Sequence, residues 1–297
     1  VNNSTSAQII NVPVALSAAE TINAASGNIT LSSTLNSDVN LLTVAGAGNT
    51  TISGVVTGSG LTKNGSGTLT FGASGNSLNG SFSVNGGALN VTGGSTAFGT
   101  GVSRVGYLTG SGNLTMTGGS LTTDGELQVG GSDQNGTSIN ATGAVALTSA
   151  TLTVGALTVA RGNNNQNTCS GTVTLNPGSV LNSESDVLLG FAGNNNLGKV
   201  VVNGGTLNVA TATKRWLIMS EWDTSLSEFD VNSGQVNLNA NTDIRFATGN
   251  NSGTNTFNLN GGAVTFYSDN ATTVGGSGVV DLHQGNGSAV VNTFNLN

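Results

Sequence analysis

Short apolar stretches separated by turns rich in Gly and Asn run along the whole chain, and within each stretch apolar residues alternate with polar ones. The pattern is clearest in three copies of one phrase: SFSVNGGALNV at 81–91, KVVVNGGTLNV at 199–209 and TFNLNGGAVTF at 256–266. Alternation with a period of two residues is typical of a β-strand that buries one face. Each copy therefore predicts two short strands joined by a corner, for which the Gly pair supplies the backbone freedom.

The alternate apolar residues of each copy are the predicted core residues. In the first copy they are Phe82, Val84, Leu89 and Val91, and in the last copy Phe257, Leu259, Val264 and Phe266. One copy buries too little apolar surface to be stable alone, so the copies must stack on one another. The sequence thus predicts a repetitive all-β protein.

A second phrase, a strand followed by a Gly/Asn turn, sets the predicted length of the repeat. The last apolar residue of this strand recurs at Val129, Val159, Leu189, Met219, Phe246 and Leu282, with spacings of 30, 30, 30, 27 and 36 residues. A spacing near 30 fits a β-solenoid with three short strands and three corners per coil, and roughly nine or ten such coils would fit the chain. No stretch has the apolar spacing of an amphipathic helix.

The chain is expected to form a single β-solenoid, residues 1–297, with three consecutive parts. Residues 1–59 hold irregular N-terminal strands that form a cap or a donor segment. Residues 60–124 hold the coils that surround the first full phrase, and residues 125–297 hold the regular coils, the last of them incomplete. A repeat array runs as one elongated body, so no domain boundary is predicted.

The composition narrows the possible partners. Only 7% of the residues are charged and 4% are aromatic, whereas Asn, Ser and Thr fill most polar positions and suit ladders of identical side chains. The formal net charge is −7, and seven basic residues are too few for a surface that follows phosphates or anionic lipids. No apolar run approaches the ~20 residues of a membrane helix. Neither a nucleic-acid partner nor membrane insertion of this chain is therefore expected.

Residues 60–91 resemble the autotransporter-associated β-strand repeat, also called the passenger-associated transport repeat, of bacterial surface proteins. That motif runs Gly-Leu-Thr-Lys, a Gly-rich turn, Gly-Thr-Leu-Thr, an Asn with an aromatic residue, and then Val-Asn-Gly-Gly-Thr-Leu. The matching residues are Gly60 to Lys63, Gly65, Gly67 to Thr70, Asn76, Gly80, Val84 to Gly87 and Leu89, with Leu78 where the family has an aromatic. The resemblance implies a right-handed parallel β-helix that a bacterium exports and displays or sheds.

The sequence begins at Val1 and not at Met. This fits a mature product whose secretory signal has been removed, or a recombinant fragment. Together with the resemblance, the expected location is extracellular or on the bacterial cell surface. The expected function is a non-enzymatic structural or adhesive element, and the alternative is a β-helix that binds or degrades polysaccharide.

Residues 214–230, KRWLIMSEWDTSLSEFD, depart most strongly from the repeat. The candidate ligand or partner patch within them is Trp222, Glu221, Asp223 and Trp216. An exposed Trp can stack on a sugar ring while nearby carboxylates accept its hydroxyls, which would give a site for an extracellular glycan or matrix component. The other interpretation, which the sequence favours, places Trp216 in or against a core strand and makes residues 221–225 an ordinary loop.

Residues suited to catalysis are scarce, so neither a catalytic site, a cofactor nor a metal is expected. His283 is the sole histidine and Cys169 the sole cysteine, which leaves almost no material for a zinc site or a catalytic triad and excludes an intrachain disulfide. Cys169 is interpreted as a small loop or core residue in preference to a reactive or bridging thiol. Among the acids, Asp186 and Asp243 are expected on one face, with Arg215 or Trp216 between them.

The two ends of the chain predict a partner, namely the protein itself. The last residues, VNTFNLN at 291–297, stop partway through the repeated phrase, and AQIINVPVAL at 7–16 is interrupted by Pro13. Either the natural chain continues, or a neighbouring subunit completes the coil by β-strand addition and builds head-to-tail filaments. The candidate assembly residues are Ile9, Ile10, Val12, Val14, Phe294 and Leu296.

Overall fold

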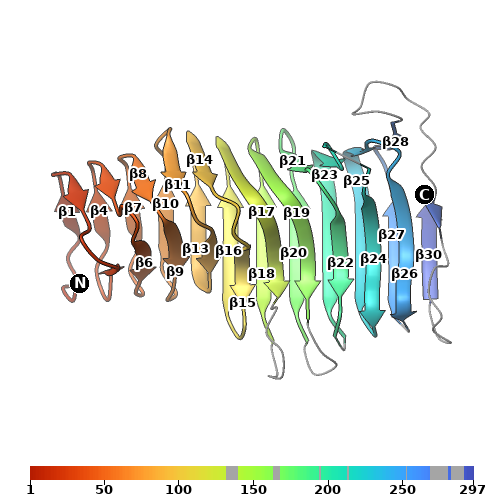
Figure 1. The fold of residues 1–297 in the computed structure, drawn as a ribbon, viewed down its shortest axis with the longest axis horizontal. Helices are drawn as coiled ribbons and strands as arrows, with labels where there is room; N and C mark the ends of the chain where they lie inside the picture. The colour runs from red at the N-terminus through yellow and green to blue at the C-terminus, as the bar shows by residue number, and fades with distance from the viewer. Residues whose placement is uncertain are drawn as a thin grey trace.

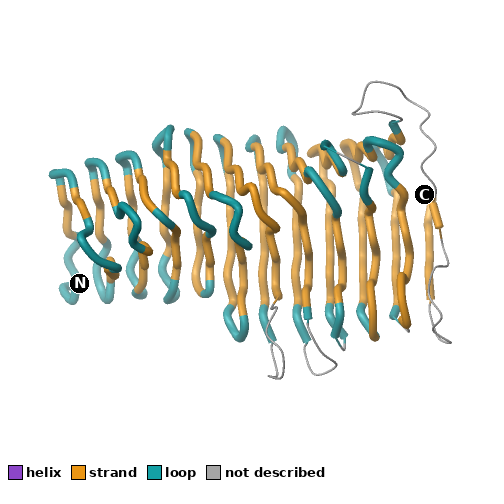
Figure 2. Tube along the Cα trace, in the orientation of Figure 1, coloured by secondary structure: helices purple, strands orange, loops and turns teal. Residues whose placement is uncertain are grey.

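The computed structural model describes residues 1–131, 140–162, 168–193, 195–212, 214–251, 253–267, 280–281 and 291–297, with the side chains of 222–223 and 247–251 left out. Within these residues the chain forms thirty β-strands and no helix. Strands of successive coils pair in parallel and stack into an elongated body with the two termini at opposite ends (Figure 1). Corners of a few residues separate most strands of one coil (Figure 2). The fold is a parallel, solenoid-like all-β fold.

The strands fall into three columns, called here the first, second and third face. The first face holds β1 (Gln8–Ile10), β4 (Ile29–Leu31), β7 (Thr50–Ile52), β10 (Thr68–Phe71), β13 (Gly86–Val91), β16 (Ser111–Met116), β18 (Thr142–Leu147), β20 (Ser170–Leu175), the first parts of β23 (Leu197–Val209) and β25 (Leu226–Leu238), β27 (Thr254–Leu259) and β30 (Val291–Leu296). The second face holds β2 (Val14–Ala15), β5 (Leu35–Asn36), β8 (Val56–Gly58), β11 (Asn76–Leu78), β14 (Ser95–Phe98), the first parts of β17 (Ser120–Gly131) and β19 (Thr151–Arg161), β21 (Val180–Ser183), the ends of β23 and β25, and β28 (Ala263–Phe266). The third face holds β3 (Glu20–Asn23), β6 (Leu41–Ala45), β9 (Gly60–Lys63), β12 (Phe82–Val84), β15 (Ser103–Tyr107), the ends of β17 and β19, β22 (Val187–Phe191), β24 (Trp216–Asp223), β26 (Asp243–Asn251) and β29 (Val280–Asp281).

The core is a continuous apolar column, because the parallel register places each inward side chain directly on its counterpart in the next coil. On the first face the column is apolar apart from Thr50 and runs through Ile29, Thr50, Leu69, Leu89, Leu114, Val145, Val173, Val200, Phe229, Phe257 and Phe294. The rings of Phe229 and Phe257 stack at 4.9 Å with planes only 2° apart, and Phe294 stacks on Phe257 at 4.9 Å.

The predicted inward residues of the repeated phrase are confirmed. Those of the first copy are fully buried, as is Phe257 of the last copy. The remaining three of the last copy, Leu259, Val264 and Phe266, are partly buried and pack against the core. Alternation in the sequence therefore identified the correct face of these strands.

Coil length is not uniform, so a single 30-residue period does not describe the whole chain. Near the N-terminus Ile29 pairs with Thr50, 21 residues on. Further along, Val145 pairs with Val173, 28 residues on. The first coils are accordingly shorter than the later ones (Figure 1). The described part of the first face holds twelve strands, more than the nine or ten coils expected from a constant spacing.

The strand that recurs about every 30 residues lies on the third face. Its apolar residues pair in register from Val129 through Val159, Leu189 and Met219 to Phe246, while Leu282 lies outside the described residues. The residue that follows each of the first four has a left-handed backbone: Gly130 (φ 65°), Ala160 (φ 60°), Gly190 (φ 63°) and Ser220 (φ 64°). This repeated kink changes the direction of the chain after the last inward residue.

The Asn-Gly-Gly copies occupy different corners. The copy at 81–91 turns from β12 on the third face to β13 on the first face, whereas the copies at 199–209 and 256–266 turn from the first face to the second. At Gly87 (φ 66°) a Cβ atom would lie 2.2 Å from the carbonyl oxygen of Gly67, so the corner needs Gly. The phrase is thus a corner motif and does not mark one fixed position in the coil.

Asn side chains form ladders along the corners, as the sequence predicted. The Nδ2 atoms of Asn232, Asn260 and Asn297 each donate to Oδ1 of the Asn in the preceding coil, at 2.8, 2.8 and 2.7 Å, and the ladder begins at Asn203. On the second face Asn237 donates to Asn208, and Asn208 to Asn182, both at 2.7 Å. An uncharged amide both donates and accepts, so it repeats along the stack without electrostatic repulsion.

Lys63, a residue of the resemblance motif, points into the core. It is only 1% exposed, and its Nζ donates to the carbonyl oxygens of Asn64 (2.7 Å), Gly65 (3.0 Å) and Gly86 (3.3 Å). The ammonium thus joins two successive corners from inside. Burial lowers the pKa of Lys63 below its usual value of 10.5. Alternation places Lys63 on the same side of β9 as the buried Leu61, but a charged residue at an inward position is not expected from the sequence.

We expect Phe229→Ala to lower the free energy of unfolding by about 3–5 kcal/mol, because it removes a ring from the middle of a stack and leaves a cavity. Thr174→Ala, on the outward side of the same face, is the matched control and should change it by less than about 0.5 kcal/mol. Guanidinium unfolding followed by circular dichroism measures both. Equal midpoints for the two variants would contradict the stacked core.

Lys63 should make the free energy of unfolding depend on pH in the alkaline range. Because its pKa is lower in the folded than in the unfolded chain, the ionised form disfavours folding below the folded pKa. This penalty disappears as the pH rises through the folded pKa toward 10.5. The wild type should therefore gain stability relative to Lys63→Met between about pH 7 and about pH 10.5 in urea unfolding. A stability difference that stays constant over this range would show that the folded pKa is not lowered.

Candidate functional site

An outer layer of side chains covers the middle of the third face. Gln128, Thr158 and Ile218 alternate with core leucines and so point outward, yet they are 1%, 0% and 5% exposed. Strands buried on both sides are expected only where something packs on the second side. Here the cover comes from long side chains of the same face.

The first part of this layer is centred on Glu126. Its carboxylate receives Nη1 of Arg161 at 3.0 Å, Nε2 of Gln128 at 3.1 Å and the hydroxyl of Thr158. The guanidinium of Arg161 also lies over the ring of Phe191, 4.9 Å from its centroid. Arg161 and Phe191 directly follow the left-handed residues Ala160 and Gly190, so the repeated kink places them in the layer.

The second part is centred on Trp216 at the start of β24. The guanidinium of Arg245 lies 4.5 Å from the ring centroid of Trp216 and 3.3 Å from the carboxylate of Asp243. The backbone N–H of Trp216 donates to Asp186 at 2.9 Å, and Trp216 pairs in register with Asp243. The predicted column of Asp186 and Asp243 therefore exists, and Trp216, not Arg215, lies between them.

All four arginines of this acidic chain lie on or beside the third face. Arg104, Arg161 and Arg245 are on its strands, each against an aromatic ring, that of Arg104 being Tyr107 at 4.6 Å. Arg215, just before β24, donates to Ser185 at 3.0 Å. Guanidinium groups stack on rings more readily than ammonium groups, which accounts for arginine here.

The structure places the predicted ligand patch on β24, and the prediction of an ordinary loop at 221–225 is wrong for residues 221–223, which belong to this strand. Trp216 and Glu221 lie five positions apart on this strand, and Glu221 pairs in register with Phe191. The side chains of Trp222 and Asp223 lie outside the described residues. One face of the Trp216 ring is occupied by Arg245, so Trp216 contributes to the outer layer and does not offer a free stacking surface on that side.

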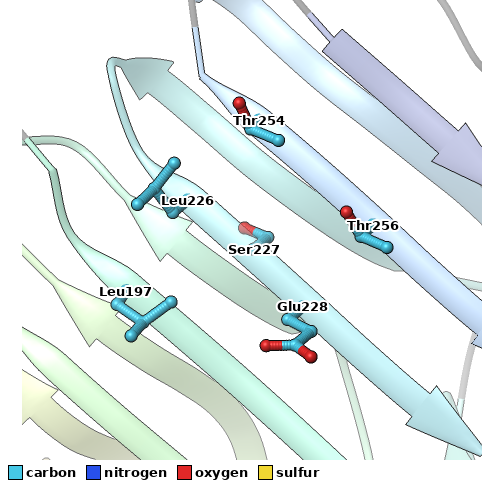
Figure 3. A pocket seen from close by; sticks show the side chains of 6 residues that line it. All are labelled: Leu197, Leu226, Ser227, Glu228, Thr254 and Thr256. Atoms are coloured by element: carbon cyan, nitrogen blue, oxygen red, sulfur yellow. The ribbon is translucent and has the colours of Figure 1, made fainter.

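A shallow hollow on the first face is the candidate site that the sequence did not indicate (Figure 3). It has a volume of about 190 Å³ and lies over β23, β25 and β27, near the start of each strand. Its lining residues are Leu197, Leu226, Ser227, Glu228, Thr254 and Thr256. Leu197, Leu226 and Thr254 are register partners, so the two leucines are neighbours in successive coils.

A charge cluster borders this hollow. Nζ of Lys199 lies 2.8 Å from Glu228 and 3.1 Å from Asp230. The other oxygen of Asp230 accepts from Nδ2 of Asn258 at 2.7 Å, and Asn258 accepts from Asn295 at 2.7 Å. Burial alone would lower the pKa of Lys199, but the hydrogen bonds and charges of the two carboxylates outweigh it and raise the pKa. The ammonium therefore stays charged and holds Glu228 in place.

The remaining candidates for chemistry were the single cysteine, the single histidine and groups of acids. Cys169 is 1% exposed beside Ala141 and Ala160, and burial raises the pKa of its thiol despite a hydrogen bond with the backbone of Ala141, as suits a small core residue. Among the described residues, no three His, Cys, Asp or Glu side chains come together as a group that could hold a metal ion. His283 lies outside the described residues.

The predicted assembly residues lie at the two ends of the stack (Figure 1). Ile9, Ile10 and Val12 are 64%, 38% and 63% exposed at the N-terminal end, and Val14 is partly buried. At the other end Phe294 packs on the core, and Leu296 is 71% exposed.

The chain matches no family model, no curated protein sequence and no solved structure. In the part of the chain that the structure describes, no helix has the length and apolar character needed to cross a membrane.

We expect the outer layer of the third face to stabilise the fold. In a double-mutant cycle, Arg161→Met and Glu126→Gln should show a coupling of about 1 kcal/mol, because the pair is partly shielded from solvent and makes charged hydrogen bonds. Arg215→Met is the control, since Arg215 is exposed and donates to the hydroxyl of Ser185. A coupling indistinguishable from zero in urea unfolding would show that the layer adds nothing to stability.

Proposed function

We propose that the chain is a non-enzymatic, extracellular structural or adhesive solenoid, displayed or secreted by a bacterium. The observation that supports this most is the unbroken register across the first face, where each coil adds its strand to the one before. A stack of this kind extends a chain into a stiff rod in which each coil contacts only its neighbours. Such a body suits the display or linking of material outside the cell.

The finer part of the proposal is a right-handed β-helix of the autotransporter-associated type. It is supported by the residues of 60–91 that match the motif and by the position of Lys63, which joins two corners from within. A motif whose Lys and Gly residues build the corner would recur in coils that need this corner. The match covers one stretch of the chain, and the later coils would be looser relatives of it.

The acids favour this role over a polysaccharide-degrading enzyme. Asp186 accepts the backbone N–H of Trp216, Asp243 pairs with Arg245, and Glu126 pairs with Arg161. Carboxylates used in this way hold the fold and are not poised as an acid and a base. Binding of a polysaccharide remains the second candidate, and the hollow beside Glu228 favours it.

Head-to-tail assembly with a second copy is a further element of the proposal. The side of β30 away from β27, which has no partner strand among the described residues, would receive β1 of the next molecule as an added parallel strand. β1 has three residues and β30 has six, so such a contact covers only part of the β30 edge. The apolar residues exposed at both ends, among them Ile9 and Leu296, would be covered.

The location is tested in the producing bacterium with antibodies raised against this chain. We expect the protein in the surface or culture-medium fraction, degraded by protease added to intact cells, because an exported rod is accessible from outside. A cytoplasmic enzyme that survives the same treatment is the control. Protein that is protected until the cells are lysed would contradict the proposal. Negative-stain micrographs of the purified chain should show rods, and filaments if head-to-tail assembly holds.

A further inference from the structure

We propose that the hollow on the first face binds one hexopyranose unit of a neutral polysaccharide. The inference rests on the proposed adhesive function and names its ligand class. It stands on three features of the hollow: an apolar floor, an oriented carboxylate with hydroxyl groups beside it, and a charge balance that disfavours anions.

The floor is a pair of leucines at positions that are polar in the neighbouring coils. The register column runs Ser170, Leu197, Leu226 and Thr254, and the two leucines are 39% and 36% exposed. Exposed leucines at adjacent rungs are unusual on a face whose outward residues are otherwise largely Thr, Asn and Ala. A sugar ring has one side made of C–H groups, and such a side would remove these leucines from water.

The polar side of the hollow is formed by Glu228, Thr254 and Thr256 (Figure 3). The ion pair with Lys199 orients the Glu228 carboxylate, which is 38% exposed and retains acceptor capacity for hydroxyl groups. The Thr hydroxyls can donate or accept. Ser227 takes no part, because its hydroxyl donates inward to the carbonyl oxygen of Leu189 at 2.8 Å. A ring with neighbouring hydroxyls matches this arrangement.

The charge beside the hollow and the volume of the hollow further restrict the class of ligand. One ammonium, Lys199, faces two carboxylates, Glu228 and Asp230, so the cluster beside the hollow carries a net negative charge. An anionic ligand such as a uronic acid would be repelled. The volume of about 190 Å³ is below the roughly 300–1,000 Å³ of a pocket that encloses a whole small molecule. It suits one unit of a longer chain that lies across the sheet.

The third face does not compete for this ligand in its described part. Its outward positions Gln128 and Thr158 are already covered by Glu126 and Arg161, and Arg245 lies on Trp216. A sugar would have to displace these contacts, whereas the hollow on the first face is open. Geometry therefore favours the first face.

The test is calorimetric titration of the purified chain with cellohexaose, mannohexaose and chitohexaose, with oligogalacturonate as the anionic probe. We expect at least one neutral oligomer to bind and the anionic one not to bind. Glu228→Gln and Leu226→Thr should each weaken binding about tenfold or more. The first removes the charged acceptor of the hollow, and the second removes half of its apolar floor. Circular dichroism melts verify that both variants are folded.

Two distant substitutions serve as matched controls: Glu184→Gln for the loss of an exposed carboxylate and Val39→Thr for the loss of an exposed apolar side chain. Both should bind as the wild type does. The inference is overturned if no neutral oligomer binds, if oligogalacturonate binds as well, or if the hollow variants bind unchanged. Since the assay uses purified protein, its outcome is independent of where the protein is located, and it separates this inference from the proposed function.

Discussion

Parallel in-register pairing between successive coils is the constraint on which the structure depends. In the described strands each coil uses its backbone N–H and C=O groups on its neighbours, so a coil by itself would leave most of these groups unpaired. The same register forces every side chain to lie on the equivalent side chain one coil away. Only residues that tolerate their own kind can fill such columns, which accounts for the Phe229–Phe257–Phe294 stack and for the amide ladder that starts at Asn203.

This constraint also determines where charge is tolerated. A column of like charges a few ångströms apart would repel, so charged side chains are rare, and several of them lie beside a group of opposite sign in a neighbouring coil. Lys199 beside Glu228 and Arg161 near Glu126 show this arrangement. Lys63 solves the problem differently, because three carbonyl oxygens surround its ammonium inside the core. These charged side chains therefore mark contacts between coils.

Much of the fold was predictable from alternation, and the inward residues Phe82 to Val91 are where the sequence placed them. The length of each coil could not be predicted from alternation, because a corner can gain or lose residues without changing the pattern of the strands on either side. Lys63 was missed because a charged residue is expected at the surface, although alternation places it on the same side of its strand as the buried Leu61. The hollow beside Leu226 was also missed, since it depends on two exposed leucines meeting across coils, which requires the register. The outer layer could have been anticipated from the small residues that follow the strand recurring about every 30 residues. Gly130 and Ala160 are two of these small residues.

The residues with a left-handed backbone explain how the third face differs from the first face. Ala160 and Ser220 carry side chains at φ values that cost a residue with a Cβ roughly 1–2 kcal/mol each, so the kink must be supported by its surroundings. At Ala160 the support is the outer layer: the kink directs Arg161 outward, and the contacts of Arg161 with Glu126 and Phe191 hold the kink. At Ser220 the hydroxyl donates to the carbonyl oxygen of Ser225 at 3.0 Å. The third face is thereby closed on its outer side, although Oε1 of Gln128, Nε of Arg161 and Nε1 of Trp216 are buried there without a hydrogen-bond partner among the described residues. Over the described residues of β23, β25 and β27 the first face has no such layer, so Leu197 and Leu226 stay open to solvent, and a ligand surface can exist there without weakening the stack.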